Sequence, residues 1–349
     1  MKKLFILMAV IILASLLAIS CGGTTSTPAG TTSTTPPKAI VLRWATPYPV
    51  ADPYGFLPKD AINRFNQRAG GRYVIEFHPA AELVALPEHA DAIRTKTVEM
   101  GLYPIGPLEG VDARFNSSEL PFLFNNVQAN AAGLLEMVPL YDEILTTKFN
   151  QKLLAATTGG ACELVSVKKP IKTLDDIQGE LTQALSPLLA SLIQTWGGSP
   201  VTVSGSEIYS ALQKGVVDCT LAPLGAVLAW GLSDVSKYCT LGYFTPAGDF
   251  TTINLDVWKA MPSDIQKALT EEMAQMATDL NNARFKQLDD AVALLKSQKM
   301  EIYILPKAER DKYQAKAQPY IDQLVTGMGD FGKKVVDIGN KVNAQNPYK

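Results

Sequence analysis

Residues 173–186 read TLDDIQGELTQALS, and this stretch predicts the alternation of short helices and strands that organises the chain. Thr173 can cap a helix, and Asp176 follows three residues later, as in a capping box. Gly179 ends that helix after barely two turns, and ELTQAL is expected to form a short strand. Such a turn presents the next side chain, Gln183, to the space beside it. A neutral amide there can donate and accept hydrogen bonds but carries no charge.

The same alternation continues on both sides of this stretch. Downstream, Ser186 is a cap for a helix that begins with Pro187 and ends at Gly197, and Ser206 caps the next helix, which stops at Gly215. Strands of this unit are expected at 152–158, 162–168, 201–203 and 216–222. The segment therefore predicts an α/β unit.

An earlier part of the chain predicts a second unit of the same kind. Its elements are a strand at 41–46, a helix at 59–69, a strand at 72–79, a helix at 88–97 and a strand at 98–103. The order β-α-β-α-β indicates a parallel sheet with helices on its faces. A helical stretch around 126–148 follows this unit and leads to the strand at 152–158.

A long helix is expected at 263–297, because few helix breakers occur there. Thirty-odd residues at 1.5 Å each span roughly 50 Å, which exceeds the width of one small domain. The helix is therefore expected to run along both units.

Length and charge narrow the function classes. The 349 residues are enough for two domains with full-sized cores. The formal net charge of −2 gives no indication of a nucleic-acid partner or of an acidic surface partner.

The N-terminus carries an export signal. Residues 1–21 contain two lysines, then a run of about sixteen mostly apolar residues, and end in AISC. This ending resembles a bacterial lipoprotein signal, although Ala18 stands where leucine is usual. We expect Cys21 to be lipidated and to become the mature N-terminus; simple cleavage or a retained anchor are the alternatives. Residues 22–38 contain nothing that builds a core and are expected to form a flexible tether.

Signatures of catalysis or of metal binding are weak. Cys162, Cys219 and Cys239 predict either one disulfide with a free thiol or, the favoured interpretation, three buried thiols. His78 and His89 lack partners at metal-ligand spacing. The stretch GMGDFGKK at 327–334 matches glycine-rich loops poorly and is interpreted as a helix C-cap. No catalytic residue, metal site or cofactor is therefore expected, and two exported α/β units without such a signature favour a two-lobed binding protein with its ligand between the lobes.

Seven pieces of sequence stand in a characteristic order over more than 200 residues. They are AGGRYVIEFHPAAELV, TVEMG, ELPFLF, KKPIKTLDDIQG, EIYSALQKGVVD, DVSKYCTL and INLDVWKAMPSDIQ. From about Val41 to Gln275 the chain thus resembles the extracytoplasmic solute-binding proteins of TRAP transporters, of the DctP type. The resemblance implies a periplasmic-binding-protein-like α/β fold with two lobes bridged by a long helix. It also implies small and large membrane subunits as partners, driven by an ion gradient.

The resemblance further implies that the chain crosses between lobes more than once. Lobe I is expected at 39–158, with about 250–280 returning to it. Lobe II is expected at 159–249, with about 281–349 packing on it and across the lobes. The protein would be extracytoplasmic and lipid-anchored to a bacterial membrane, and it would deliver a small solute to the permease. A binding lipoprotein of another transporter class, a sensor or an exported hydrolase are the alternatives.

The expected ligand positions depart from the family pattern. Gln183 stands where the family usually has an arginine that pairs with a substrate carboxylate, and Cys162 or a neighbour stands at a second arginine position. Leu221 and Ala222 replace a polar pair. No arginine occurs between Arg114 and Arg284. The ligand is therefore expected to be neutral, or to have its acid group met by other means than an arginine clamp.

Family position predicts the residues near the ligand. For Tyr103 and Trp230 core packing is the alternative, and for Glu82 it is a solvated rim. The expected set is Tyr54, Glu82, Tyr103, Cys162, Gln183, Leu221, Ala222, Trp230 and Asn254.

Overall fold

The computed structural model describes residues 38–203 and 207–348. The signal segment with Cys21, the tether and the cap Ser206 lie outside these residues, so the predictions made for them stay predictions. The fold described below is that of the unit Ala39–Lys349. Within the described ranges, no helix combines the length and the apolar character that crossing a membrane requires.

A nine-stranded sheet forms the centre of the described residues. Its strands are β1 (Ile40–Ala45), β2 (Tyr73–His78), β3 (Met100–Pro104), β4 (Gln151–Ser166), β5 (Leu181–Ala184), β6 (Ser199–Thr202), β7 (Cys219–Pro223), β8 (Tyr238–Asn254) and β9 (Glu301–Ile304). The order is β2-β1-β3-β8-β4-β7-β5-β6, and β9 pairs with β8. Strands β1, β2 and β3 pair in parallel, which confirms the parallel sheet predicted for the first unit. Strands β5, β6 and β7 of the second α/β unit also pair in parallel.

The antiparallel pair β4 and β8 joins these two parallel groups. Two separate strands were predicted at 152–158 and 162–168, and that prediction is wrong, because a single strand, β4, runs without a break from Gln151 to Ser166. The register shifts between Thr158 and Gly160, where Gly159 intervenes, and between Cys162 and Leu164, where Glu163 intervenes. Gly160 has φ +97°, a conformation that side chains with a Cβ rarely adopt.

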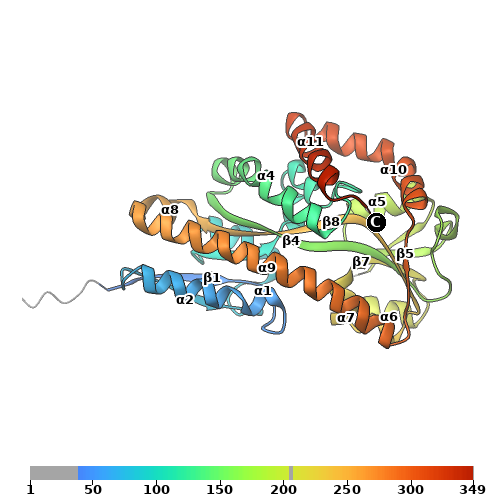
Figure 1. Ribbon diagram of the computed structural model, residues 1–349, viewed down its shortest axis with the longest axis horizontal. Coiled ribbons are helices and arrows are strands. Elements are labelled where there is room, and N and C mark those ends of the chain that lie inside the picture. The colour runs from blue at the N-terminus through green and yellow to red at the C-terminus, as the bar shows by residue number, and fades with distance from the viewer. Residues whose placement is uncertain (1–37, 204–206, 349) are drawn as a thin grey trace, which may run out of the picture. The chain divides into compact units, whose positions relative to one another are not determined.

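Helices cover both faces of this sheet (Figure 1). The α-helices are α1 (Pro53–Phe56), α2 (Pro58–Arg68), α3 (His89–Arg94), α4 (Val127–Lys148), α5 (Pro187–Trp196), α6 (Ile208–Gln213), α7 (Leu224–Ala229), α8 (Leu255–Ala260), α9 (Ser263–Ser297), α10 (Lys307–Gly327) and α11 (Asp330–Gln345). The 3-10 helices are η1 (Leu86–Glu88), η2 (Gly106–Leu108), η3 (Ala113–Ser118), η4 (Leu174–Ile177) and η6 (Leu232–Asp234).

Local sequence signals predicted several of these elements correctly, but two elements are shorter in the structure than predicted. The predicted capping box is present, since Thr173 and Asp176 bond reciprocally at the start of η4. The predicted helix at 88–97 is only the six residues of α3, preceded by η1. The predicted strand at 216–222 begins only at Cys219, because residues 216 and 217 still close the turn after α6.

The long helix is continuous over 263–297, as predicted, and contacts both parallel groups (Figure 1). Its first half packs Leu269 and Met273 into a core cluster with Leu42 of β1. Its second half packs Leu295 into another cluster with Leu212 of α6. The two parallel groups of strands are therefore connected twice, once by α9 and once by the paired strands β4 and β8.

Two adjacent leucines at the end of α9 test this packing. Leu295 is fully buried, whereas Leu294 is 47% exposed. Leu295→Ala should lower the free energy of unfolding by about 2–5 kcal/mol, because it leaves a cavity in the core. Leu294→Ala should change it by less than about 0.5 kcal/mol. Urea denaturation of both variants measures the difference, and equal effects would show that this end of the helix does not pack as described.

Candidate functional site

A cavity of about 660 Å³ lies where the central strands meet the start of α4, α9 and the C-terminal residues. Its lining comes from α4, β4, β8, α7, α9, β9 and residues 345–348. Aliphatic side chains line the α7, β8, α9 and β9 sides of the wall, and amide side chains line the α4 and C-terminal sides. Volume and composition are typical of a small-molecule site.

Glu163 is the buried acidic side chain of this cavity. It belongs to β4, opposite the bulge in β8, and only 6% of its surface is exposed. Its Oε2 accepts hydrogen bonds from the N–H groups of Gly242 (2.7 Å) and Tyr243 (3.0 Å). Burial outweighs these bonds and the charge of Arg310, and raises the pKa of Glu163 to about 8.

The bulge that holds Glu163 depends on a glycine. Tyr243 has a positive φ of 49°. A Cβ at Gly242 would lie 2.5 Å from the ring of Phe244, so no larger residue fits there without movement. The β8 backbone therefore turns two successive N–H groups toward the carboxyl group, an arrangement that favours its charged form locally.

Arg310 lies behind the bulge and fixes the C-terminal segment. Its Nε donates to the carbonyl of Gly242 (2.8 Å) and its Nη2 to that of Phe124 (2.9 Å). Its guanidinium stacks on the ring of Tyr348, 4.6 Å from the centroid. Burial lowers the pKa of Arg310. The guanidinium of Arg310 is bound by backbone carbonyls and aromatic rings, so its role is to support the wall of the cavity.

A second group of acids lies where β3 and β5 end. Ser186 donates to Glu119 (3.1 Å), which links the start of α5 to the segment after η3. Burial raises the pKa of Glu119, and burial together with the charge of Glu119 raises that of Glu109. The thiol of Cys162 also has a raised pKa, through burial and through the charges of Glu119, Glu163 and Glu109. Acidic side chains therefore surround β4 at Cys162.

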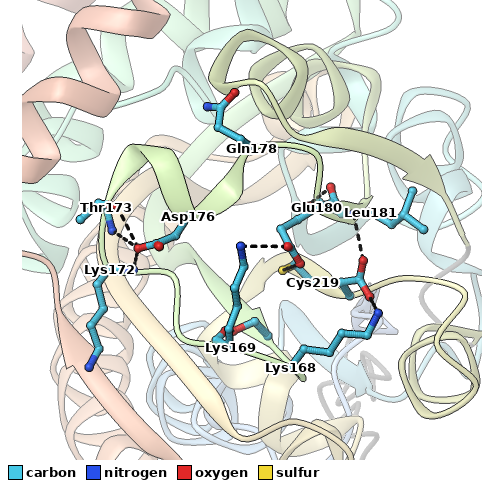
Figure 2. Close-up of polar contacts among 12 residues, drawn as sticks. Lys168, Lys169, Lys172, Thr173, Asp176, Gln178, Glu180, Leu181 and Cys219 are labelled. Carbon is cyan, nitrogen blue, oxygen red and sulfur yellow. Dashed lines mark hydrogen bonds and ion pairs between the residues drawn. The ribbon is translucent and has the colours of Figure 1, made fainter.

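The lysines of the arginine-poor region are paired with acids elsewhere. Figure 2 shows Lys169 beside Glu180 (3.0 Å), on the segment around η4. Lys168 pairs with Asp218 (2.5 Å) in the same region. Lys172 pairs with Glu301 (3.0 Å). These side chains hold the η4 segment against the sheet, and none of the three lines the cavity.

Gln183 is buried within the sheet. Its Nε2 donates to the carbonyl of Val203 (2.9 Å), and its Oε1 accepts from Thr220 (2.5 Å). No part of the residue is exposed. In this structure the amide therefore ties β5 to β7 and to the segment after β6.

Three other residues of the expected set lie on β4 and β7. Leu221 and Ala222 are buried on β7, where they pair with Leu164 and Glu163 of β4. Cys162 is the neighbour of Glu163 on β4. All three cysteines are free and buried, as the favoured interpretation predicted.

The remaining expected residues do not converge with these. Asn254 caps α8 and donates to Ile93 (2.9 Å), at the end of β8. Tyr103 donates to Gln151 (2.7 Å) and lines a separate cavity of about 450 Å³. Glu82 is largely exposed beside His78 (3.4 Å), and Trp230 is half-buried after α7.

Tyr54 belongs to a buried network that the sequence did not predict. Its hydroxyl donates to the carbonyl of Thr158 (2.6 Å), and its ring lies under the guanidinium of Arg284. Arg284 pairs with Asp52 (3.4 Å), so the first arginine after the arginine-free stretch is buried against α1.

Sequence reasoning also missed Glu163, Glu109 and Glu119. The signal for Glu163 was a single acid within the apolar run CELVSV, next to the position assigned to a family arginine. Glu119 opens the quoted piece ELPFLF.

Comparison with known proteins places this architecture in a family. The family model of the bacterial extracellular solute-binding proteins, family 7 (DctP), matches residues 56–327. The chain belongs to this family. It is a TRAP-type extracytoplasmic solute-binding protein, and the family is one of binding proteins, not of enzymes.

The relatives are distant but cover most of the chain. The C4-dicarboxylate-binding periplasmic protein DctP of Rhodobacter capsulatus is 25% identical over 268 residues, which cover 74% of this chain and 78% of that protein. The C4-dicarboxylate-binding protein DctB of Bacillus subtilis is 23% identical over 290 residues, covering 81% of this chain and 82% of that one.

Solved structures confirm the two-lobed α/β fold. A TRAP periplasmic solute-binding protein from Ochrobactrum anthropi aligns with a TM-score of 0.82 at 20% identity, covering 88% of this chain and 97% of that one. That protein has its C-terminus bound in its ligand-binding pocket. One from Chromohalobacter salexigens with bound D-glucuronate aligns with a TM-score of 0.76 at 19% identity, covering 86% and 99%.

The raised pKa of Glu163 predicts how stability depends on pH. The unfolded chain releases this proton near the ordinary value of 4.5, whereas the folded protein keeps it up to about pH 8. Between these values the folded state binds more protons, so this group makes the free energy of unfolding fall as pH rises, by at most about 1.4 kcal/mol per pH unit.

Replacing the acid tests this dependence. Glu163→Gln should flatten the decline between pH 5 and pH 8 relative to the unmodified protein, as measured by urea denaturation at each unit. Glu180→Gln, which changes an acid paired with Lys169, should leave the slope as it is. Parallel curves for the unmodified protein and Glu163→Gln would show that the folded protein does not hold this proton.

Proposed function

We propose that this protein is the lipid-anchored solute receptor of a TRAP transporter. It captures a small solute between its lobes and delivers it to the small and large membrane subunits. In this proposal Cys21 carries the lipid and residues 22–38 form the tether. Lobe I comprises 39–158 with about 250–280, and lobe II comprises 159–249 with about 281–349 packing on it and across the lobes.

The observation that carries the proposal is the position of the 660 Å³ cavity. Residues 125–128 come from the proposed lobe I, whereas Glu163, Leu224 and Tyr243 come from lobe II. The family match supports a binding function, and the two-lobed fold supports capture at the junction of the lobes. The C-terminal residues that line the cavity also have a parallel in the Ochrobactrum anthropi protein, whose C-terminus occupies its pocket.

We place the solute in this cavity, beside β4 at Glu163. Of the expected set, Cys162, Leu221 and Ala222 lie next to this position on β4 and β7 but are not among the lining residues. At the position of the family arginine this chain has Gln183, whose amide is buried among backbone and hydroxyl partners. We therefore do not assign to this chain the C4-dicarboxylate ligands for which two relatives are named. A solute without an arginine-clamped carboxylate fits the acidic surroundings of this strand better.

Calorimetry of the purified protein tests the ligand class. In metal-free buffer, C4-dicarboxylates, 2-oxo acids and sialic acid should show no submicromolar binding. An uncompensated carboxylate loses several kcal/mol in a desolvated site, which is two or more decades of affinity. Gln183→Ala should lower the free energy of unfolding by about 1–3 kcal/mol, because it leaves buried partners unpaired. Submicromolar binding of any of these acids, unaffected by Gln183→Ala, would contradict the missing clamp.

A further inference from the structure

Glu163 has one oxygen that the protein does not use. Its Oε2 accepts both N–H groups of the β8 bulge, and no residue in the described ranges donates to its Oε1. The side chain is more than nine-tenths buried, yet it lines the cavity. A buried carboxyl oxygen with an open side toward a cavity has room for one more hydrogen-bond donor.

The rest of the wall carries no compensating positive charge. Among the described residues that line the cavity there is no lysine, arginine or histidine, and the second acid there is Asp289 of α9. The positive charge of Arg310 acts on Glu163, but its N–H groups donate to the carbonyls of Gly242 and Phe124. A cation at Glu163 must therefore come from a bound molecule.

The remaining surface selects an apolar body. Aliphatic side chains from α7, β8, α9 and β9 line this part of the cavity; they are Leu224, Leu241, Leu288, Val292 and Ile304. Burying a hydrocarbon group against these side chains favours binding, because it removes apolar area from water. The volume of about 660 Å³ accommodates a small solute of this kind.

Resting on the proposed function, we infer that the solute is an amine with a compact apolar body, whose ammonium group donates to Oε1 of Glu163. A charge-assisted bond of this kind is about twice as strong as a neutral one. The ammonium also replaces the proton that burial keeps on Glu163, so binding near neutral pH releases a proton from the carboxyl group. Asp289 adds negative potential on the α9 side of the cavity.

Three probes with the same hydrocarbon body test the inference by calorimetry. They are cyclohexylmethylamine, cyclohexylmethanol and cyclohexanecarboxylate, measured at pH 7 on the full protein. The amine should bind at least about tenfold more tightly than the alcohol, and the carboxylate should not bind. Titrations in buffers of different ionisation enthalpy should show release of up to one proton with the amine and none with the alcohol.

Variants separate Glu163 from the cavity as a whole. Glu163→Gln keeps an oxygen for the two N–H groups and removes the charge, so it should weaken the amine at least about tenfold and leave the alcohol within about threefold. Glu180→Gln, the same substitution outside the cavity, should leave all three probes unchanged. Carboxylate binding equal to that of the amine, or an unchanged amine affinity in Glu163→Gln, would overturn the assignment.

The outcome distinguishes this inference from the function itself. If the amine does not bind but another small solute does, and X-ray scattering shows the lobes closing on it, the amine assignment fails and the receptor function stands. If no solute from a broad library binds or closes the lobes, the proposed function fails with it.

Discussion

The antiparallel pairing of β4 with β8 is the constraint on which the other features depend. The two strands run 16 and 17 residues, and each is hydrogen-bonded to one parallel group on one part of its length. A pair of this length would be rigid if its register were regular. The register shifts near Gly160 and Cys162 interrupt it at the junction of the two groups. In the proposed function, we expect bending of the lobes relative to each other to be concentrated at this interruption.

The same interruption creates the chemistry of the site. Because β8 bulges at Gly242 and Tyr243, their N–H groups turn away from the ladder and meet Glu163. On the other side of the bulge, Arg310 donates a hydrogen bond to the carbonyl of Gly242. Its guanidinium stacks on Tyr348 near the C-terminus. A single irregularity thus positions an acid, a supporting cation and the last described residues around one cavity. In the proposed function, this acid stands near a position where relatives are expected to carry an arginine.

How much of this could be predicted from the sequence depended on the range of the interactions involved. The capping box at Thr173 and the unbroken α9 follow from local signals, and the structure confirms both. The continuity of β4 could not be seen, because Gly159 and Gly160 are typical of a break unless a partner strand bridges them. The burial of Gln183 depends on Thr220 and Val203, which come from other elements of the sheet. Which face of β4 Glu163 occupies depends on bulges that no spacing in the sequence reveals.

The central claim is that this member of the family recognises its solute without an arginine clamp, in acidic surroundings. A thermal-shift screen of the purified protein against a solute library sorted by charge tests that claim most directly. A solute that binds the folded state and not the unfolded chain stabilises the fold by RT ln(1 + [L]/Kd), and it therefore raises the unfolding temperature. The account predicts stabilisation by amines and neutral solutes with apolar bodies, and none by simple mono- or dicarboxylates. Stabilisation by carboxylates alone would contradict it.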